Sequence, residues 1–468
     1  MSRKMTVPRA AQAGPLLLSA ALLAGCINLA PDYQRPALPV PSALPAGAQA
    51  ADAALPAVNE LLRDDRLRRV VQQALANNRD LRVALLNVER ARSQVRLADA
   101  SRWPIVSPAF SAGRAPSAAT GEQANTFQLG LQVSGFEIDL FDRIRNLSDA
   151  AAASYLASEA ASRTARLALV TQVVSTWFTL AADQEQLALA RQTLAGREQT
   201  LKLTELRVNV GAASDVELHG TRGLLAQAQA SVAALTRQAA LDANALALLV
   251  GQPVATDALP TADAPLNSEA LAAVPAGASS DLLLRRPDVI QAEQTLIAAN
   301  ANIGAARAAM FPRITLSGSA GVISDTLRGL IESGTFAWTL GVNGAFSIFD
   351  AGRNQANVKV SEVNRDIAVA QYEKAIQSAF RETSDALVAQ ATWRDQVTAQ
   401  QTLRDGERER LRLTRMRYEG GAANLIELLD SERSLAAADQ ALVLGRLGEL
   451  LNRLALYKAL GGEERAAS

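Results

Sequence analysis

The chain has 468 residues, of which 49% are hydrophobic and only 4% are aromatic. Few aromatic side chains together with abundant alanine favour long, closely packed helices over a bulky globular core. Lys and Arg together number 47, as do Asp and Glu, so the formal net charge is zero. This balance argues against nucleic acid as a partner, because no excess of positive charge is available to attract phosphates.

The first 25 residues are typical of an export signal, with a basic start and an apolar stretch (16–25) too short for a stable membrane helix. The stretch Leu-Ala-Gly-Cys at 23–26 resembles the lipobox of bacterial lipoproteins. That resemblance implies cleavage before Cys26, a covalent N-acyl and S-diacylglycerol lipid on this residue, and sorting to the outer membrane, since Ile27 rather than aspartate follows. The alternative is an ordinary signal peptide with an incidental cysteine. Cys26 is the only cysteine, which excludes an internal disulfide and a cysteine-rich metal site.

The second half of the chain repeats the first at an offset of about 208 to 210 residues. Leu140–Asp142 matches Ile348–Asp350, and Arg207–Leu218 matches Arg417–Leu428. Several matches in one order and at one spacing exceed what chance produces between alanine-rich helices. Each copy is predicted to contain a helix, two strands, a long helix, a tight turn and a second long helix.

Segments within 314–322, 335–348 and 126–134 alternate between apolar and small polar residues. A period of two predicts strands with one apolar and one polar face. The alternation slips near Gly135, which predicts a β-bulge, and Pro108 weakens the prediction of the first strand. A soluble sheet packed on a core is the alternative, but strands of ~10 residues with small polar partners are also what a membrane barrel needs.

No segment after the leader contains the 18 or more uncharged apolar residues of a transmembrane helix. If the mature chain crosses a bilayer, we therefore expect it to do so as a closed β-barrel. Four strands cannot close a barrel, so several copies of the chain must contribute strands, and cyclic symmetry is the simplest arrangement.

Two long helical hairpins are predicted to project from this sheet. The stretch from about 147 to 207 contains no proline, and Leu187, Leu194 and Leu201 recur at the seven-residue spacing of a coiled coil. At ~1.5 Å per residue such a helix reaches ~90 Å, which is too long for a compact domain. The stretch from about 355 to 417 has the same character.

Each long helix ends at a Gly-Ala-Ala turn and a new helix starts at once. Gly211 and Gly421 stand where a helix C-terminus favours glycine. Ser214 and Asn424 are placed as N-caps of the returning helices. These four residues therefore define the two hairpin turns.

Several motifs resemble those of a known family, and they span about residues 26–462. They are Pro31–Pro36, Asn77–Arg82, Val274–Leu284 leading into Arg285–Asp288, Gly304–Pro312 and Ala370–Gln377. The chain is similar to the outer-membrane factors of Gram-negative tripartite efflux pumps, of TolC type. It is most similar to the lipoproteins that serve resistance-nodulation-division pumps.

The resemblance implies an α+β membrane protein, a homotrimeric TolC-like duct. Four β-strands per chain would share a twelve-stranded barrel, above a long coiled-coil α-helical barrel and a mixed equatorial belt. The duct would be a passive exit for small molecules, in the outer membrane and in contact with its lipid, extending into the periplasm. Its expected partners are a periplasmic adaptor (membrane fusion) protein and a proton-driven inner-membrane pump.

The predicted organisation follows the repeat along the chain. It comprises a signal peptide (1–25), a lipid-anchored tether and equatorial segment (26–65), a helix (66–102), β-hairpin 1 (103–140), helical hairpin 1 (147–250), an equatorial connection (251–284), a helix (285–311), β-hairpin 2 (312–349), helical hairpin 2 (353–458) and a tail (459–468).

By resemblance, Glu427 and Asp430 match the acidic pair that narrows the periplasmic mouth in the family. They lie three residues apart on one helix face, so a trimer would place six carboxylates around one axis, which would attract cations. Tyr418 and Glu217 match a tyrosine and a carboxylate that link neighbouring hairpins in the closed state. Ala423 stands where the best-known members carry an arginine, so that latch is missing or different here.

Simpler roles compete with these assignments. Glu217 and Glu427 both have the spacing of a capping box, in which the glutamate only returns a hydrogen bond to the cap. The arginine cluster within 408–417 could dock an adaptor or attract anions, but such a run is more often the solvated face of a helix. His219 is the sole histidine, so no metal site is expected.

No Gly-rich phosphate loop, nucleophile with its base, or ligand cluster is present in the sequence, so we expect neither an enzyme nor a cofactor. Two other functions remain open at this stage. One is an exit duct of the same architecture for type I protein secretion. The other is a periplasmic coiled-coil lipoprotein scaffold that never enters the bilayer.

Overall fold

The structure is a computed structural model that describes residues 27–41, 55–116, 121–261, 266–274, 280–332 and 334–462. Cys26 and the leader lie outside the described residues. The chain divides into two compact units, and the division falls inside four of its helices. Unit 1 comprises 1–37, 88–158 and 292–372, and unit 2 comprises 38–87, 159–291 and 373–468. Each unit is described by itself.

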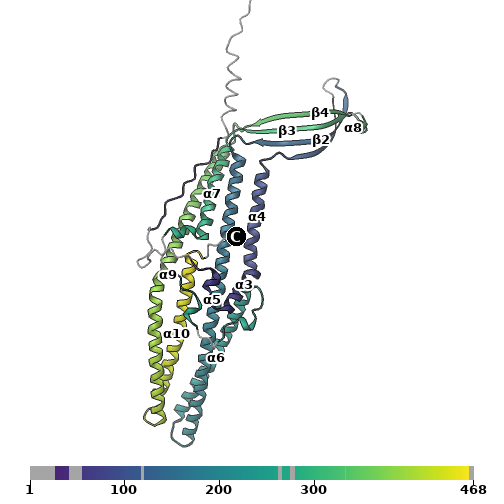
Figure 1. The fold of residues 1–468 in the computed structure, drawn as a ribbon. Coiled ribbons are helices and arrows are strands. Elements are labelled where there is room, and N and C mark those ends of the chain that lie inside the picture. The colour runs from purple at the N-terminus through teal and green to yellow at the C-terminus, as the bar shows by residue number, and fades with distance from the viewer. Residues whose placement is uncertain are drawn as a thin grey trace, which may run out of the picture. The chain divides into compact units, whose positions relative to one another are not determined.

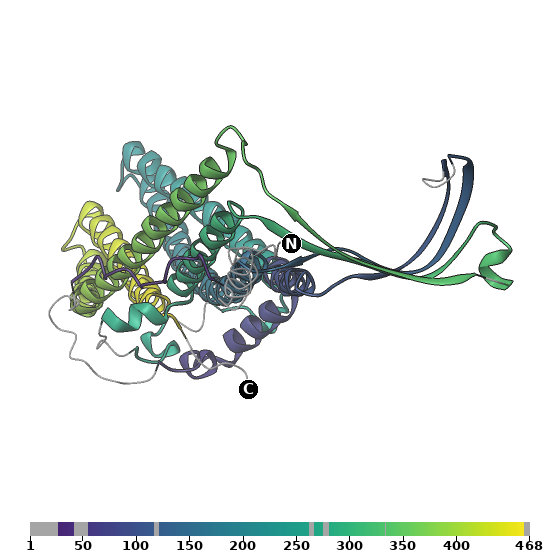
Figure 2. The ribbon, with the colours of Figure 1, turned by 90° about the horizontal axis from the view of Figure 1, so that it is seen from above.

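Unit 1 contains one antiparallel sheet of four strands in the order β1-β2-β3-β4. The strands are β1 (Val106–Pro116), β2 (Gln123–Ile138), β3 (Arg313–Ser324) and β4 (Thr335–Ala345), with the short helix α8 (Gly329–Glu332) between β3 and β4. Figure 2 shows the four strands running side by side and curving together. Both β-hairpins of the sequence repeat therefore join into a single sheet through the pairing of β2 with β3.

Three local features of the sheet follow from the sequence. The pairing of β2 with β3 shifts register between Val133 and Phe136, which is the predicted bulge, and Gly135 there has a φ of 64°. Pro108 is tolerated because β1 is an edge strand, where a missing N–H disrupts no inner ladder. The predicted extension of the last strand to Ile348 is wrong, since β4 ends at Ala345, which pairs with Arg313 at the start of β3.

The apolar face of this sheet is not covered by any element in the part of the chain that the structure describes. Phe336, Trp338, Leu340 and Val342 of β4 are 66% to 68% exposed, and Leu131 of β2 is 56% exposed. The alternative of a soluble sheet packed on its own core is therefore wrong. On the polar face, small hydroxyl side chains pair across the strands instead.

Residues 27–37 run along helix α7 (Pro287–Ala308) as an N-terminal strap. Three side chains of α7 bond the strap. Glu293 accepts from Tyr33 and from Arg35. Asn300 donates to the carbonyl of Pro31, and Arg307 donates to the carbonyl of Leu29. Burial, followed by the charge of Glu293, raises the pKa of Tyr33 to about 12. At its first described residue, Ile27 donates its backbone N–H to the Leu140 carbonyl over 3.2 Å.

The strap also explains why Gly304 is a glycine. Any Cβ at this position of α7 would lie 2.6 to 2.8 Å from Asn146 and Ala30. The segment after the predicted lipidation site is therefore not a loose tether over these residues. It is packed on α7 and hydrogen-bonded along its length.

Long helices contribute to both units, and the shorter helices apart from α8 lie in unit 2 (Figure 1). The long ones are α4 (Arg79–Ala100), α5 (Arg143–Asn209), α6 (Asp215–Val250), α7, α9 (Arg353–Glu419) and α10 (Leu425–Ala459). The shorter ones are α2 (Val58–Leu61), α3 (Asp65–Asn77) and the 3₁₀ turns η2 (Thr256–Ala258), η3 (Ser268–Ala270) and η4 (Ser280–Arg285). Helices α5 and α9 both contain 67 residues, as the repeat requires.

The repeated motifs around Asn78 and Arg286 hold the ends of the returning helices. Asn78 donates from Nδ2 to the Leu249 carbonyl near the end of α6, and its Oδ1 accepts from the Leu81 backbone in the first turn of α4. Arg286 donates to the carbonyl of Ala459, the last residue of α10. Both contacts satisfy carbonyls that a helix C-terminus leaves without partners.

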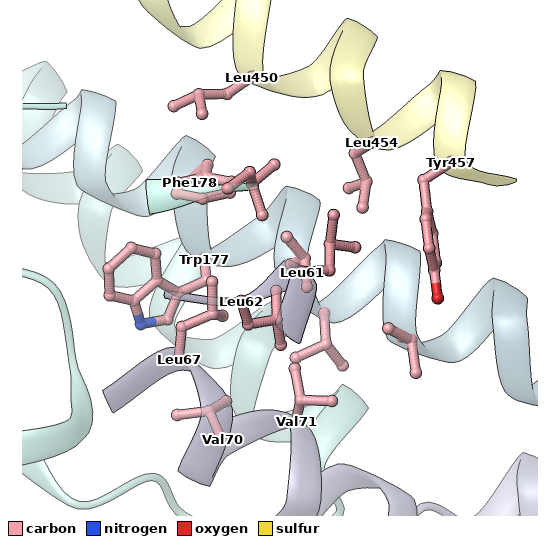
Figure 3. Packing of buried hydrophobic residues seen from close by; sticks show 14 of the residues in the cluster. Leu61, Leu62, Leu67, Val70, Val71, Trp177, Phe178, Leu450, Leu454 and Tyr457 are labelled. Carbon is pink, nitrogen blue, oxygen red and sulfur yellow. The ribbon is translucent and has the colours of Figure 1, made fainter. Parts of the chain in front are cut away.

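The main hydrophobic core lies in unit 2, where α3, α5 and α10 meet. Figure 3 shows Leu67, Val70 and Val71 of α3 beside Trp177 and Phe178 of α5. From α10, Leu450, Leu454 and Tyr457 close the cluster on the other side. The α5 segment within this core is the one helical stretch, among the described residues, apolar enough to cross a membrane, and half of it is buried inside the protein. Its hydropathy is explained by this core.

A pair of carboxyl groups lies between α5 and α6. The Asp183 carboxyl lies near that of Asp242, whose Oδ2 is buried without a hydrogen-bond partner among the described residues. Burial and a second carboxyl group close by both disfavour the ionised form of a carboxyl group. Burial, followed by the Asp242 carboxyl, raises the pKa of Asp183 to about 7.

This pair predicts a pH-dependent contribution to the stability of the first helical hairpin. The folded protein holds the proton to a higher pH than the unfolded chain does, so the contribution is complete at about pH 4 and is lost as the pH rises through about 7. After allowance for solvent screening we expect it to be ~1 kcal/mol. Asp242→Asn should flatten this dependence, measured as the thermal unfolding midpoint between pH 5 and 8. Glu198→Gln, at an exposed site on α5, is the control, and equal slopes for wild type and Asp242→Asn would contradict the assignment.

Candidate functional site

The two helical hairpins of unit 2 end in turns of the same construction, at the lower end of Figure 1. Gly211 and Gly421 both have a φ of 73°, a left-handed conformation that favours glycine. In each turn the residue after the glycine donates its N–H to a helix carbonyl over 2.7 Å, from Ala212 to Arg207 and from Ala422 to Arg417. These bonds end α5 and α9 and return the chain at once.

Ser214 and Asn424 cap the returning helices. Ser214 accepts from the backbone N–H of Glu217, whose carboxylate accepts from the Ser214 N–H over 3.0 Å, so this turn has a complete capping box. Asn424 Oδ1 accepts from the backbone of Glu427 over 2.9 Å. The Glu427 carboxylate makes no capping-box bond back to Asn424, and Arg417 Nη1 lies 3.6 Å from its Oε2.

Asp430 is held between two arginines. Arg433 donates to its Oδ1 over 2.6 Å, and Arg410 donates to its Oδ2 over 3.2 Å. The hydrogen bond from Arg433 and the positive charge of both arginines hold the pKa of Asp430 below its ordinary value. This carboxylate is therefore ionised at neutral pH, but its charge is balanced by its neighbours.

Tyr418 joins the two hairpins of one chain. Its hydroxyl accepts from Arg207 Nη1 over 2.8 Å, and the Arg207 guanidinium also lies 5.7 Å from the centre of the Tyr418 ring. The predicted partner Glu217 is instead engaged in its own cap. In the described chain the tyrosine therefore reaches the first hairpin through an arginine that the sequence had not singled out.

Sequence reasoning also missed the most buried ion pair between the hairpins. Arg197 of α5 donates to Glu432 of α10 over 2.7 Å, and their side chains are only 8% and 13% exposed. Arg415 lies 3.5 Å from the other oxygen of Glu432. An arginine in the middle of a coiled-coil helix was the available signal, but its partner is 235 residues away in the sequence.

The arginine cluster within 408–417 is largely occupied by carboxylates of its own hairpin. Arg410 pairs with Asp430, Arg412 with Glu409, Arg415 with Glu432 and Arg417 with Glu427. This pairing fits a solvated, ion-paired helix face better than an anion-attracting patch. Among the described residues no group of His, Cys, Asp and Glu side chains could hold a metal ion.

The sequence and the fold were compared with known proteins. The family model described as "Outer membrane efflux protein" matches residues 70–252 and 278–462, most of the chain. The chain belongs to this family of outer membrane efflux proteins. Its relatives in the family include the solvent efflux pump outer membrane protein SrpC of Pseudomonas putida, with 41% identity over 94% of this chain and 96% of the relative. Another is OprJ of Pseudomonas aeruginosa, with 40% identity over 96% and 95%.

Solved structures of outer-membrane channels have the same fold. The open state of the MtrE channel of Neisseria gonorrhoeae is 34% identical, with a TM-score of 0.84 over 93% of this chain and 98% of that one. The CmeC channel of Campylobacter jejuni is 26% identical, with a TM-score of 0.83 over 93% and 95%. The predicted TolC-type α+β fold is therefore confirmed. This member of the family is an outer-membrane efflux channel protein of the kind found in Gram-negative bacteria.

The acidic residues at the second turn lead to a prediction about the channel mouth. Removal of Glu427 and Asp430 leaves Arg417 and Arg433 without these carboxylates and leaves Arg410 with Glu407 alone, so a narrow mouth lined by them would become more positive. We expect Glu427→Ala with Asp430→Ala to widen the pore and to lower or reverse its cation preference. Single-channel conductance and reversal potential in planar bilayers measure both.

Glu409→Ala is the matched control for this experiment. Glu409 lies on α9 and also pairs with an arginine, Arg412, but it is outside the turn. The control should leave conductance and selectivity unchanged. An unchanged conductance and cation preference in the double variant would show that these carboxylates do not line the narrow part of the pore.

Proposed function

We propose that this chain is the outer-membrane channel subunit of a tripartite efflux system. It would be a passive exit duct for small molecules expelled by a proton-driven inner-membrane pump. The observation that supports this most directly is a sheet whose apolar face is exposed in the isolated chain, in a protein whose family is that of outer membrane efflux proteins. We propose no catalytic role.

The channel is proposed to be a homotrimer. The edge strands β1 and β4 have no strand partner among the described residues on their outer sides, and each contains 11 residues. Exposed edges of this length recruit further strands. Pairing of β4 of one copy with β1 of the next would close the sheet, and three copies would give twelve strands. The exposed apolar face would then contact outer-membrane lipid.

The lipid anchor is proposed at Cys26. The strap that follows Cys26 begins with Ile27, whose backbone N–H donates to the carbonyl of Leu140, two residues after the end of β2. If β2 crosses the membrane, this contact would hold an acyl chain on Cys26 at the level where the barrel meets the helices. The strap would therefore fix the position of the lipid along the protein, whereas the sequence alone predicts only that the lipid lies near the N-terminus.

An adaptor protein is proposed to dock on the hairpin turns. Each turn exposes apolar side chains at positions that the repeat makes equivalent, with Leu206 and Val216 in the first and Met416 and Ile426 in the second. Val216 and Ile426 are 81% and 77% exposed. Exposed apolar side chains gathered at one end of a long assembly favour an interaction with another protein.

The names of the relatives support small, mainly apolar compounds as cargo. Relatives are described as outer membrane proteins of solvent, toluene and antibiotic efflux pumps. The same architecture could serve protein secretion, but none of these names refers to it. A periplasmic scaffold that stays outside the bilayer would leave the apolar sheet face without a partner.

The barrel is tested by two neighbouring residues of β4 that lie on opposite faces. Leu340 is on the exposed apolar face, whereas Thr339 bonds Ser319 on the polar face over 2.8 Å. Leu340→Arg should cost ~2–4 kcal/mol of insertion energy at mid-bilayer and so abolish membrane assembly and drug resistance in a complemented deletion strain. Thr339→Arg, the matched control, should assemble and change conductance. Equal tolerance of both substitutions would exclude a lipid-facing strand.

The anchor is tested by Cys26→Ser behind a cleavable signal. If the protein forms a barrel as well as carrying a lipid, the variant should remain in the membrane fraction after carbonate extraction. Mass spectrometry of the wild-type protein should show the acyl groups on Cys26. If the variant became fully water-soluble, the protein would be a lipid-tethered scaffold and not a membrane channel. An unmodified Cys26 in the wild type would remove the lipid from the proposal but not the channel.

A further inference from the structure

A cavity of about 390 Å³ lies in unit 1 between α5, α7 and α9. Its apolar wall is formed by four alanines of α7 and by Leu147 of α5. Its polar residues are Arg143 of α5, Asn302 of α7, and Ser361 and Asn364 of α9. A cavity of this size, with a few polar groups on an apolar wall, is typical of sites that bind small organic molecules.

The polar groups of this cavity retain unused hydrogen-bonding capacity. Arg143 donates from Nε and Nη2 to the two oxygens of Glu137, both over 2.7 Å, while its Nη1 donates to no group of the described residues. The side-chain amides of Asn302 and Asn364 make no hydrogen bond with the described part of the chain either. No carboxylate is among the described residues that line the cavity. The cavity therefore offers a bound molecule one cation and several hydrogen-bond donors.

Glu137 does not neutralise this cation fully, because it serves two arginines. Its side chain is 8% exposed at the end of β2, and Arg313 of β3 pairs with it as well. Asp139, the other acid near Arg143, accepts from the backbone N–H of Arg145 over 2.8 Å. One carboxylate is thus shared between two guanidinium groups, which leaves positive charge available at the cavity.

The cavity lies on the face of α7 opposite to the strap. Asn300 and Arg307 bond the strap, whereas Asn302 and Ala309 line the cavity. Each cavity residue follows a strap residue by two positions, which is about 200° around a helix of 3.6 residues per turn. A molecule in the cavity would therefore not compete with the strap.

The cavity also adjoins the polar face of the sheet. In the pairing of β2 with β3, Glu137 is directly opposite Thr315, so both side chains lie on one face. Thr315 belongs to the polar alternation of β3, and Arg313, two residues earlier, lies on the same face. Because Arg143 bonds Glu137, it reaches this polar face from α5. In the proposed barrel the polar face lines the lumen, so the cavity would lie in the duct wall where the strands meet the helices.

We propose that this cavity is a transient binding site for cargo that carries a negative charge and an apolar body. This inference rests on the proposed exit duct and specifies a place in it. The anionic end would accept hydrogen bonds from Arg143 Nη1 and from the amides of Asn302 and Asn364, while the apolar body would cover the alanines of α7. An inorganic anion would leave the alanine wall in water, and an uncharged hydrocarbon would desolvate the arginine without bonding it. Weak occupancy suits a conduit, because conduction requires that a bound molecule can also leave.

Block of the ionic current in planar bilayers tests the site, with 1-naphthalenesulfonate as the probe. Added on the barrel side, this small aromatic anion reaches the cavity before it reaches the hairpin turns. We expect interruptions of the current that become more frequent with probe concentration. Inorganic sulfate and 1-naphthalenemethanol, which carry only the charge or only the ring, should interrupt the current far less. Equal block by sulfate, or no block by 1-naphthalenesulfonate, would overturn the inference.

A variant that fills the cavity tests its location. Ala309→Phe on α7 places a ring in the cavity, so half-maximal block should need about tenfold more probe, equivalent to ~1.4 kcal/mol. Ala356→Phe, at an exposed alanine of α9 that does not line the cavity, is the matched control and should leave the block unchanged. Equal block of the two variants would place the binding site elsewhere.

Loss of one hydrogen-bond donor tests the polar contacts. Asn364→Leu should raise the half-blocking concentration by about 2- to 10-fold, the range expected for one hydrogen bond. Asn357→Leu, at another exposed asparagine of α9 that lies two turns nearer the strands and outside the cavity, is the control. Normal channels whose block is the same in Asn364→Leu, Ala309→Phe and wild type overturn this inference alone. A protein that forms no channels at all overturns the proposed function with it.

Discussion

The rest of the structure depends on an antiparallel sheet that is incomplete within one chain. Its four strands satisfy their inner hydrogen bonds, but both edges and the whole apolar face lack partners in the described residues. Such a surface is stable in lipid only if the sheet closes on itself, because unpaired backbone groups are costly there. If the sheet closes, the long helices would share its symmetry, since in each chain every β-hairpin is followed by a helical hairpin.

The contact between the two helical hairpins of one chain depends on charge as well as on apolar packing. Alanine-rich coiled coils are similar to one another in shape, so packing alone discriminates weakly between a first and a second hairpin. Arg197 of the first hairpin reaches Glu432 of the second, which Arg415 also contacts, so two arginines flank one largely buried carboxylate. The overall balance of 47 basic and 47 acidic residues is consistent with charges arranged in pairs.

The hairpin turns combine cap geometry with ion pairs. Glu217 is fully explained by its capping box with Ser214, which is the simpler of its two predicted roles. Glu427 and Asp430 differ, because arginines rather than a cap engage their carboxylates. A ring built from these residues would carry less net negative charge than the carboxylates alone suggest, so its selectivity depends on the arginines as much as on the acids.

The sequence by itself determined three alternating strands, the bulge near Gly135 and the turns at Gly211 and Gly421, because these depend on residues close together in the chain. A comparison of the two halves of the chain gave the repeat. It also carried the family resemblance through local motifs. Only the tertiary structure decided that the strap packs on α7, that Asp183 lies near Asp242, and that Arg197 reaches Glu432. Each of these contacts joins residues far apart in the sequence, where pattern and spacing place no constraint on which side chains meet, and only the packing of long helices against one another fixes the choice.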